Sequence, residues 1–143
     1  YNGIRVNSAD GLVHEGDMRH VYGTMSTVDG ERCIAAAYTT LVSSGNAACD
    51  PVGIRLDCIG GTDVARPGPA TVGTLIRTWG IVGAKATGYF YVQGPNGGQV
   101  KVICGSPAKP SGMVAVTGVC GRTLVGGEAP VVRVRKQSDI TEF

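Results

Sequence analysis

The sequence predicts an all-β protein, for two reasons that are visible in residues 74–140. Five short runs there are rich in β-branched and aromatic residues and are separated by Gly, Pro or Asn, a pattern typical of strands and turns. None of these runs has the i, i+3, i+4 spacing of an amphipathic helix. Glycine makes up 23 of the 143 residues, roughly twice its usual ~7% share, which suits the tight turns and kinked strands of a small barrel.

The second half of the chain is expected to hold a complete barrel. Its strands are predicted at residues 75–82, 89–92, 100–103, 113–119 and 131–135. Pro95-Asn96-Gly97-Gly98 supplies a turn between the second and third strands, and Gly80 interrupts the first. Five short strands in this order, with a glycine kink in the first, are typical of an OB-type barrel with strand order 1-2-3-5-4-1. We therefore assign residues 74–143 to an OB-fold-like barrel.

The first 42 residues repeat part of the same pattern. Residues 3–6 (GIRV) match residues 99–102 (QVKV), and Glu15–Gly23 is similar to residues 111–118. A further strand at 32–37 corresponds to the closing strand of the barrel. We interpret residues 1–42 as strands three to five of an incomplete OB-like barrel that lacks the first two strands.

A rival alignment remains open for this first module. It sets residues 18–23 against 75–80, with Tyr22 matching Trp79, and would make the segment the start of a barrel. We favour the first alignment because nothing after Gly30 resembles the second strand, residues 89–92. Missing strands would leave apolar surface and backbone edges open to another chain.

Residues 43–73 are rich in Gly, Pro, Ser and Asp and are interpreted as a long linker that packs against one of the two modules. Cys49 and Cys58 lie within it, and a disulfide between them would stiffen the segment. The other cysteines are Cys33, Cys104 and Cys120. No C-x-x-C pair occurs, so the pattern does not indicate a zinc site.

Charge and composition limit the function classes. The net charge of +2 gives no overall attraction to nucleic acid, and no apolar run approaches the ~20 residues of a membrane span. The chain starts at Tyr1, which we interpret as a processed or internal start, in keeping with an extracytoplasmic location. Carboxylates are scattered among turns, and no nucleophile elbow or phosphate loop is present. We expect no enzyme activity, catalytic residue, cofactor or metal.

A resemblance supports this interpretation. The runs GTLIRTWG (73–80), VKVIC (100–104), VAVTG (114–118) and PVVRVRKQSDI (130–140) resemble tandem OB-fold modules of secreted and cell-surface bacterial proteins. That family implies tandem barrels outside the cytoplasm and carries no assigned biochemical role, so it transfers no site residues.

The function that the sequence favours is a structural subunit of an extracellular homopolymer, such as a filament, in which copies complete one another's barrels by strand complementation. The candidate inter-subunit residues are Tyr1, Ile4, Val6, Ile140 and Phe143. The alternative is an extracellular module that binds glycan or single-stranded nucleic acid through aromatic and basic side chains. The candidate ligand face comprises Trp79, Tyr89, Tyr91, Arg133 and Arg135.

Overall fold

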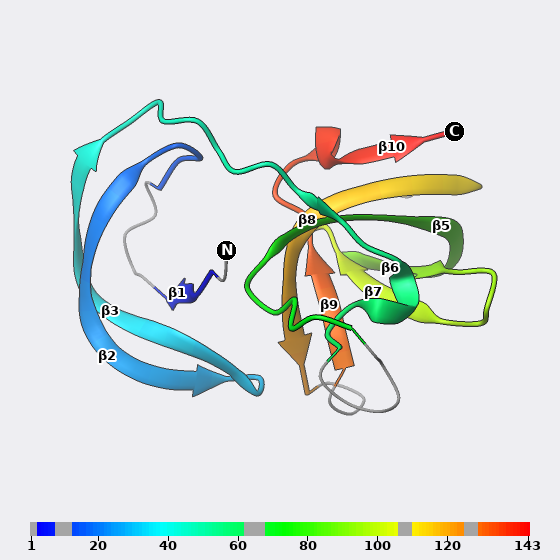
Figure 1. Ribbon diagram of the computed structural model, residues 1–143, viewed down its shortest axis with the longest axis horizontal. Helices are drawn as coiled ribbons and strands as arrows, with labels where there is room; N and C mark the ends of the chain where they lie inside the picture. Colours follow the sequence, from blue (N-terminus) through cyan, green and yellow to red (C-terminus); the bar gives the residue numbers. More distant parts are fainter. Residues whose placement is uncertain (1–2, 8–12, 62–67, 106–109, 125–128) are drawn as a thin grey trace.

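The computed structural model of this 143-residue chain describes residues 3–7, 13–61, 68–105, 110–124 and 129–143. These residues form two β-sheets that lie side by side along the long axis of the molecule (Figure 1). The first is a curved three-stranded sheet from the N-terminal part of the chain. The second closes on itself as a barrel. The all-β fold class is therefore confirmed.

The barrel is built from five strands in the predicted chain order. They are β5 (Leu75–Ala86), β6 (Tyr89–Gln93), β7 (Gln99–Ile103), β8 (Met113–Thr123) and β9 (Ala129–Arg133). Their spatial order is β5-β6-β7-β9-β8, and β8 pairs back onto β5 from Leu75↔Val119 to Ile81↔Met113. β7 and β9 run parallel while the other pairs are antiparallel. This is the predicted order 1-2-3-5-4-1.

Alternation along the strands fills the barrel. In β6, Phe90 and Val92 are buried while Tyr89 and Tyr91 point outward, as the period of two in a strand requires. The core joins side chains from every barrel strand, namely Ile76, Phe90, Val92, Val100, Val102, Val114, Val116, Cys120 and Val132.

The segment interpreted as a linker contributes to this core. It contains β4 (Val52–Gly53), which pairs in parallel with β5, and the 3-10 turn η1 (Leu56–Cys58). Ile54, Leu56 and Ile59 are buried in the barrel core. The segment therefore packs against the second module, as expected, and supplies apolar side chains that its Gly- and Pro-rich composition concealed.

The chain ends in elements that the sequence did not predict. After β9, the 3-10 turn η2 (Gln137–Asp139) leads to β10 (Ile140–Glu142), which pairs with β8 along Ile140↔Val116. The turn is held by Arg135, whose Nε and Nη2 each donate a hydrogen bond of 3.0 Å to the Asp139 carboxylate. β10 is thereby the last strand at one edge of the barrel sheet.

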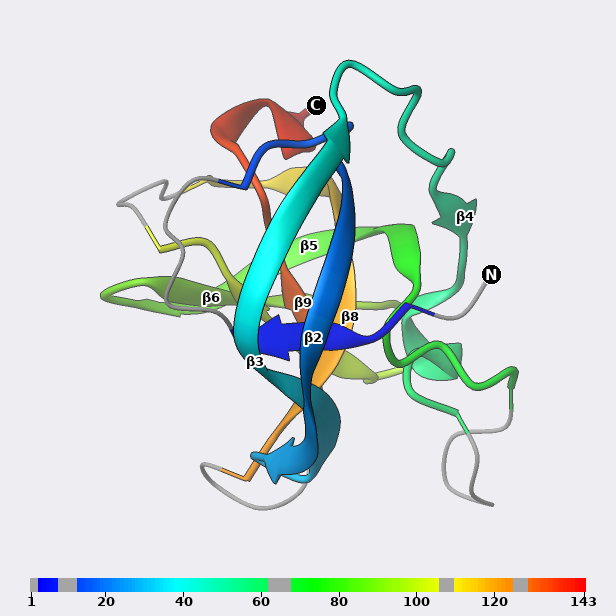
Figure 2. The same ribbon diagram turned by 90° about the vertical axis from the view of Figure 1, so that its left-hand side faces the viewer.

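The N-terminal sheet consists of β1 (Arg5–Asn7), β2 (Met18–Val28) and β3 (Glu31–Ser43) in the order β1-β3-β2. The turn between β2 and β3 has positive φ angles at Asp29 (54°) and Gly30 (76°), as a two-residue type I′ hairpin turn requires. Figure 2 looks onto this long hairpin, which lies in front of the barrel.

Strand pairing shows that this sheet is a half-barrel equivalent to strands three, five and four. β1 runs parallel to β3 with Val6 opposite Ile34, just as β7 runs parallel to β9 with Val102 opposite Val132. β2 runs antiparallel to β3, as β8 does to β9. The first alignment of residues 1–42 is thus the one that the fold follows.

A pair of glycines confirms the match residue by residue. A Cβ on Gly23 would lie 2.3 Å from the carbonyl oxygen of Ala35, and one on Gly118 would lie 2.6 Å from that of Arg133. Ala35 and Arg133 occupy the same position in the two sheets, since each lies one residue after the Ile34 or Val132 partner. Both sheets therefore need glycine where one strand crosses close over the next.

Candidate assembly surfaces

The half-barrel exposes an apolar face that the complete barrel buries. Val6, Met25 and Ile34 share this face, because Ile34 lies opposite both of the other two residues. Ile4 precedes Val6 by two residues and completes what we call the open face. The exposed fractions are 48% for Ile4, 38% for Val6 and 55% for Met25.

The equivalent positions in the barrel have the opposite environment. Val102, Cys120 and Val132 correspond by strand pairing to Val6, Met25 and Ile34, and each of the three is 0% exposed. They are covered by other core side chains, including those that β5 and β6 contribute. The described residues of the half-barrel include no counterpart of β5 or β6, so its open face lacks that cover.

The same difference leaves two strand edges at the sides of the half-barrel. In the barrel, β8 pairs with β5 through Met113–Val119, the stretch that corresponds to residues 18–24 of β2. Among the described strands, β2 and β1 each have β3 as their sheet neighbour and stand at the two edges. An edge strand next to an open apolar face is a template for added strands.

A second exposed apolar surface lies at the far end of the barrel. Ile81 (62% exposed) and Met113 (47%) face each other across β5 and β8. Phe143, 76% exposed, lies next to them because its backbone N–H donates to the Met113 carbonyl oxygen at 3.0 Å. We call these three residues the end patch. Figure 1 shows the half-barrel and the C-terminus at opposite ends of the molecule.

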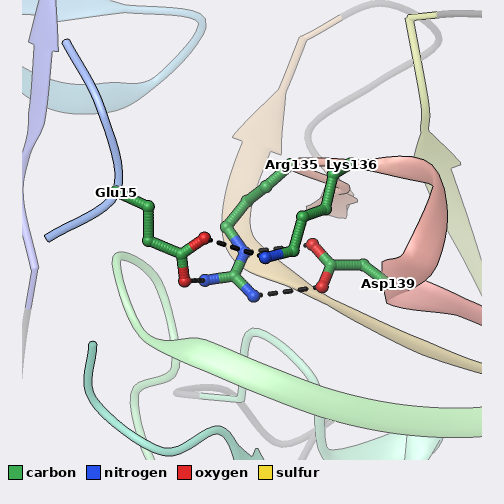
Figure 3. A network of polar contacts seen from close by, with 4 residues as sticks. All are labelled: Glu15, Arg135, Lys136 and Asp139. Atoms are coloured by element: carbon green, nitrogen blue, oxygen red, sulfur yellow. Dashed lines mark hydrogen bonds and ion pairs between the residues drawn. The ribbon is translucent and has the colours of Figure 1, made fainter. Parts of the chain in front are cut away.

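A polar network joins the half-barrel to the barrel (Figure 3). Arg135 Nη1 and Lys136 Nζ donate to the two oxygens of the Glu15 carboxylate at 2.7 and 3.1 Å. The hydrogen bond from Lys136, aided by the Arg135 charge, lowers the pKa of Glu15. Arg135 also forms its bidentate pair with Asp139, which raises the pKa of the guanidinium. Arg135 therefore couples the end of the barrel chain to the segment before β2.

Three further polar contacts lie at the junction. Glu31, 5% exposed, lies 3.8 Å from Arg133 Nη2 and accepts the backbone N–H of Arg122 at 3.5 Å. The Gly3 N–H donates to the Gly73 carbonyl oxygen at 3.1 Å. These contacts are polar and local, so they hold the half-barrel beside the barrel without covering its open face.

The predicted inter-subunit residues have varied positions. Tyr1 lies outside the described residues. Val6 belongs to β1 and Ile140 to β10, and both of these strands pair with strands of their own chain. Ile4 and Phe143 remain about half and three-quarters exposed. Thus Ile4 and Val6 contribute to the open face, Phe143 contributes to the end patch, and Ile140 anchors the strand that carries it.

The candidate ligand face does not form one surface. Tyr89 and Tyr91 make an edge-to-face pair with centroids 5.8 Å apart, and Lys101 Nζ lies 4.0 Å above the Tyr89 ring. Tyr89 lies opposite Ala86, seven positions along β5 from Trp79, which is roughly 20 Å at the rise of a strand.

The two arginines of that predicted face are engaged elsewhere. Arg133 donates from Nη2 to the Arg122 carbonyl oxygen at 3.1 Å and lies beside Glu31. Arg135 contacts Asp139 and Glu15. Both guanidinium groups therefore serve the junction, and neither continues the aromatic surface of β5 and β6.

The cysteines are thiols. No disulfide joins any of the five, all of which lie in described residues, so the expected Cys49–Cys58 bridge is not formed. Cys58 belongs to η1, where its N–H donates to the Arg55 carbonyl oxygen and its thiol lies 3.6 Å from Asp57 Oδ1, whereas Cys49 is exposed in the preceding extended segment. Burial raises the pKa of the Cys104 and Cys120 thiols, which disfavours the reactive thiolate.

Comparisons with protein-family models, with curated proteins and with solved structures found no match for this chain. The resemblance to secreted tandem OB-fold modules therefore stays a prediction. In the described ranges, no group of three or more His, Cys, Asp and Glu side chains could hold a metal ion. The same ranges contain no helix long and apolar enough to cross a membrane.

Proposed function

We propose that this chain is a structural subunit that assembles with copies of itself, and that strands of one copy complete the half-barrel of the next. The observation that carries the proposal is the equivalence of the β1-β3-β2 and β7-β9-β8 sheets. In one sheet the central apolar positions are fully buried; in the other, Ile4, Val6 and Met25 are 38–55% exposed. Covering them gives a favourable hydrophobic contribution.

The positions of the apolar surfaces favour a head-to-tail arrangement. The half-barrel, which carries the open face, and the C-terminus, beside which the end patch lies, are at opposite ends of the molecule (Figure 1). Contact between two different surfaces is heterologous, and unless the rotation closes a ring it continues as a filament. A second copy can meet the open face with its end patch. At that patch Phe143 lies beside β10, which is an edge strand of the described sheet.

In this arrangement β10 of one copy lies along the edge of β2 in the next copy. Backbone hydrogen bonds would extend the half-barrel by a strand, and Phe143 would enter the open face. Main-chain pairing supplies affinity in such strand addition, and side-chain pockets supply specificity. An extracytoplasmic setting is part of the same proposal and rests on the sequence resemblance.

Mixing two blocked variants tests the proposal. Met25→Asp blocks the open face, and Phe143→Asp blocks the end patch. Each variant alone is expected to remain monomeric by light scattering, because one of its two complementary surfaces is lost. An equimolar mixture is expected to form heterodimers and nothing larger, because only the intact open face of one variant and the intact end patch of the other can pair.

Leu124→Asp is the matched control for the end patch, since Leu124 is also an exposed apolar residue (53%) but lies beyond the other end of β8. This variant should assemble as the unmodified chain does. A wild-type chain that stays monomeric at all concentrations would contradict the proposal. A mixture of the two blocked variants that stays monomeric would contradict the head-to-tail arrangement.

A further inference from the structure

The exposed tryptophan lies in a hollow that the assembly does not use. Trp79, 48% exposed, lines a hollow of about 260 Å³ together with residues of η1 and of the β6–β7 turn. The other lining residues are Arg55, Leu56, Asp57, Gly94, Pro95, Asn96 and Gly98. Ile81 of the end patch lies two residues from Trp79 on the same outward side of β5, but it is not among the described lining residues of the hollow.

The strand pairing explains why a hollow forms there. β4 pairs with β5 as far as Arg77, and the described pairing with β6 begins at Ile81. Between these points the edge of β5 has neither neighbour, and Trp79 lies in the gap. The chain leaves β4 through η1 on one side and leaves β6 through the turn on the other.

Both walls of the hollow are held by local hydrogen bonds. In the β6–β7 turn, the Gly94 N–H donates to the Gly98 carbonyl oxygen at 2.8 Å, and Gly97 has the positive φ (76°) that this turn needs. In η1, the Cys58 N–H donates to the Arg55 carbonyl oxygen at 3.0 Å. The backbone of both walls is therefore preorganised, which lowers the entropic cost of binding.

Charge at the hollow favours an uncharged ligand. Arg55 pairs with Asp57 through Nε–Oδ1 (3.2 Å) and Nη2–Oδ2 (2.6 Å) contacts. The hydrogen bond from Arg55 lowers the pKa of Asp57, so the carboxylate is ionised at neutral pH. Among the described lining residues, Arg55 is the one cation and Asp57 the one anion, and their charges cancel. A phosphate would meet the Asp57 carboxylate without an unpaired cation of that lining to balance it.

We propose that this hollow binds one ring of a neutral sugar. The flat indole surface suits the C–H face of a pyranose, and Asp57, Arg55 and Asn96 offer acceptors and donors for its hydroxyl groups. The volume lies just below the ~300–1,000 Å³ range of pockets for drug-sized ligands, which fits a single ring with the rest of the chain outside. Assembly is not required for this site, so the proposal does not rest on the proposed function.

The chain has a single tryptophan, so tryptophan emission from dilute protein reports on this hollow. The test titrates dilute protein with maltotetraose, cellotetraose and chitotetraose, with an oligothymidylate of eight nucleotides as the charged comparison. At least one sugar is expected to shift the emission saturably with a Kd of about 1 mM, in the range for one ring at ~0.3 kcal/mol per atom.

Variants assign the response to the hollow. Asn96→Ala and Asp57→Asn keep the fluorophore and should weaken binding several-fold, and Trp79→Ala should remove binding measured by calorimetry. Leu124→Ala is the control, since Leu124 is exposed beyond the other end of β8 and belongs to neither assembly surface, and it should leave the affinity unchanged. A flat emission with all three sugars would overturn the proposal. A response to the oligothymidylate that equals or exceeds the sugars would also overturn it and assign the hollow to nucleobases.

Discussion

Met25→Asp tests most directly whether the open face of the half-barrel is covered by another copy or exposed to solvent. Met25 is 55% exposed in the single chain, so the carboxylate remains solvated there and the half-barrel keeps its fold. In the assembly the same position would be buried. The substitution would remove the hydrophobic contribution that the methionine side chain makes when the assembly covers it. Because about half of the side chain is exposed in the single chain, this contribution is about 1 kcal/mol, half of the ~1.5–3 kcal/mol for full burial.

The charge adds a larger cost. To be buried at pH 7, the aspartate must take up a proton, which requires its pKa to rise from about 3.9 to 7 or above, at ~1.36 kcal/mol per unit. The sum is about 5 kcal/mol, which corresponds to over a thousandfold in association at ~1.4 kcal/mol per tenfold. Because water at the rim relieves part of this cost, we expect the critical concentration to rise by at least about a hundredfold.

The assay is sedimentation across a concentration series at pH 7 and at pH 4. Leu124→Asp is the control, since Leu124 is also about half exposed and lies outside both the open face and the end patch. The defect of Met25→Asp should shrink at pH 4, where protonation no longer opposes burial. Equal critical concentrations for the two variants at pH 7 would refute the claim that this face is covered.

Three further predictions concern the single chain. Gly118→Ala should lower the free energy of unfolding, measured by urea denaturation, by at least ~2 kcal/mol, because its Cβ would lie 2.6 Å from the Arg133 carbonyl oxygen. Gly53→Ala is the control and should change the same quantity by less than ~0.5 kcal/mol, because its Cβ would have nothing within 4 Å. Phe90→Ala should cost ~3–5 kcal/mol by the same assay, and Ile81→Ala almost nothing, because Phe90 is 1% and Ile81 62% exposed. The lowered pKa of Glu15 means that its contacts with Lys136 and Arg135 stabilise the junction above the carboxyl's ordinary value of 4.5 and are lost as the pH falls through the lowered value. Calorimetry between pH 6 and pH 3 should show this loss of stability in the unmodified chain. The Glu15→Gln variant should lose less stability over the same range, and a pH profile equal to that of the unmodified chain would contradict the assignment.

The strands were predictable from local patterns because each barrel strand alternates between core and solvent. Residues 89–92 show this clearly, with Phe90 and Val92 inward and the tyrosines outward. The half-barrel was predictable for the same reason, since its repeat of residues 99–118 preserved both the apolar positions and Gly23. A repeat in sequence indicated a repeat in strand pairing.

What the sequence concealed depends on contacts between distant segments. Ile54, Leu56 and Ile59 are isolated among Gly, Asp and Cys residues, so no periodicity marks them as core. β10 is three residues long, and its pairing depends on the Arg135–Asp139 contact that turns the chain back toward β8.

The candidate sites, too, could be predicted only where they depend on local sequence, and not where they depend on contacts between distant segments. Arg133 and Arg135 alternate with valines, which indicates an outward side but not the Glu31 and Glu15 carboxylates that meet them from the other module. The Trp79 hollow arises where β4 and β6 leave the same edge of β5, an arrangement that no local motif encodes. Trp79 was a candidate ligand residue from the sequence, but the Pro95-Asn96-Gly97 turn that borders its hollow is distant from it in the chain.

Electron cryomicroscopy of the purified protein without ligand is the most direct test of the central claim. We predict particles in which copies repeat head to tail, with a strand from one copy along the Met18–Thr24 edge of β2 in the next and with Met25 and Val6 covered. Dispersed particles of one chain's mass, or an assembly in which that edge and the open face remain exposed to solvent, would contradict the account.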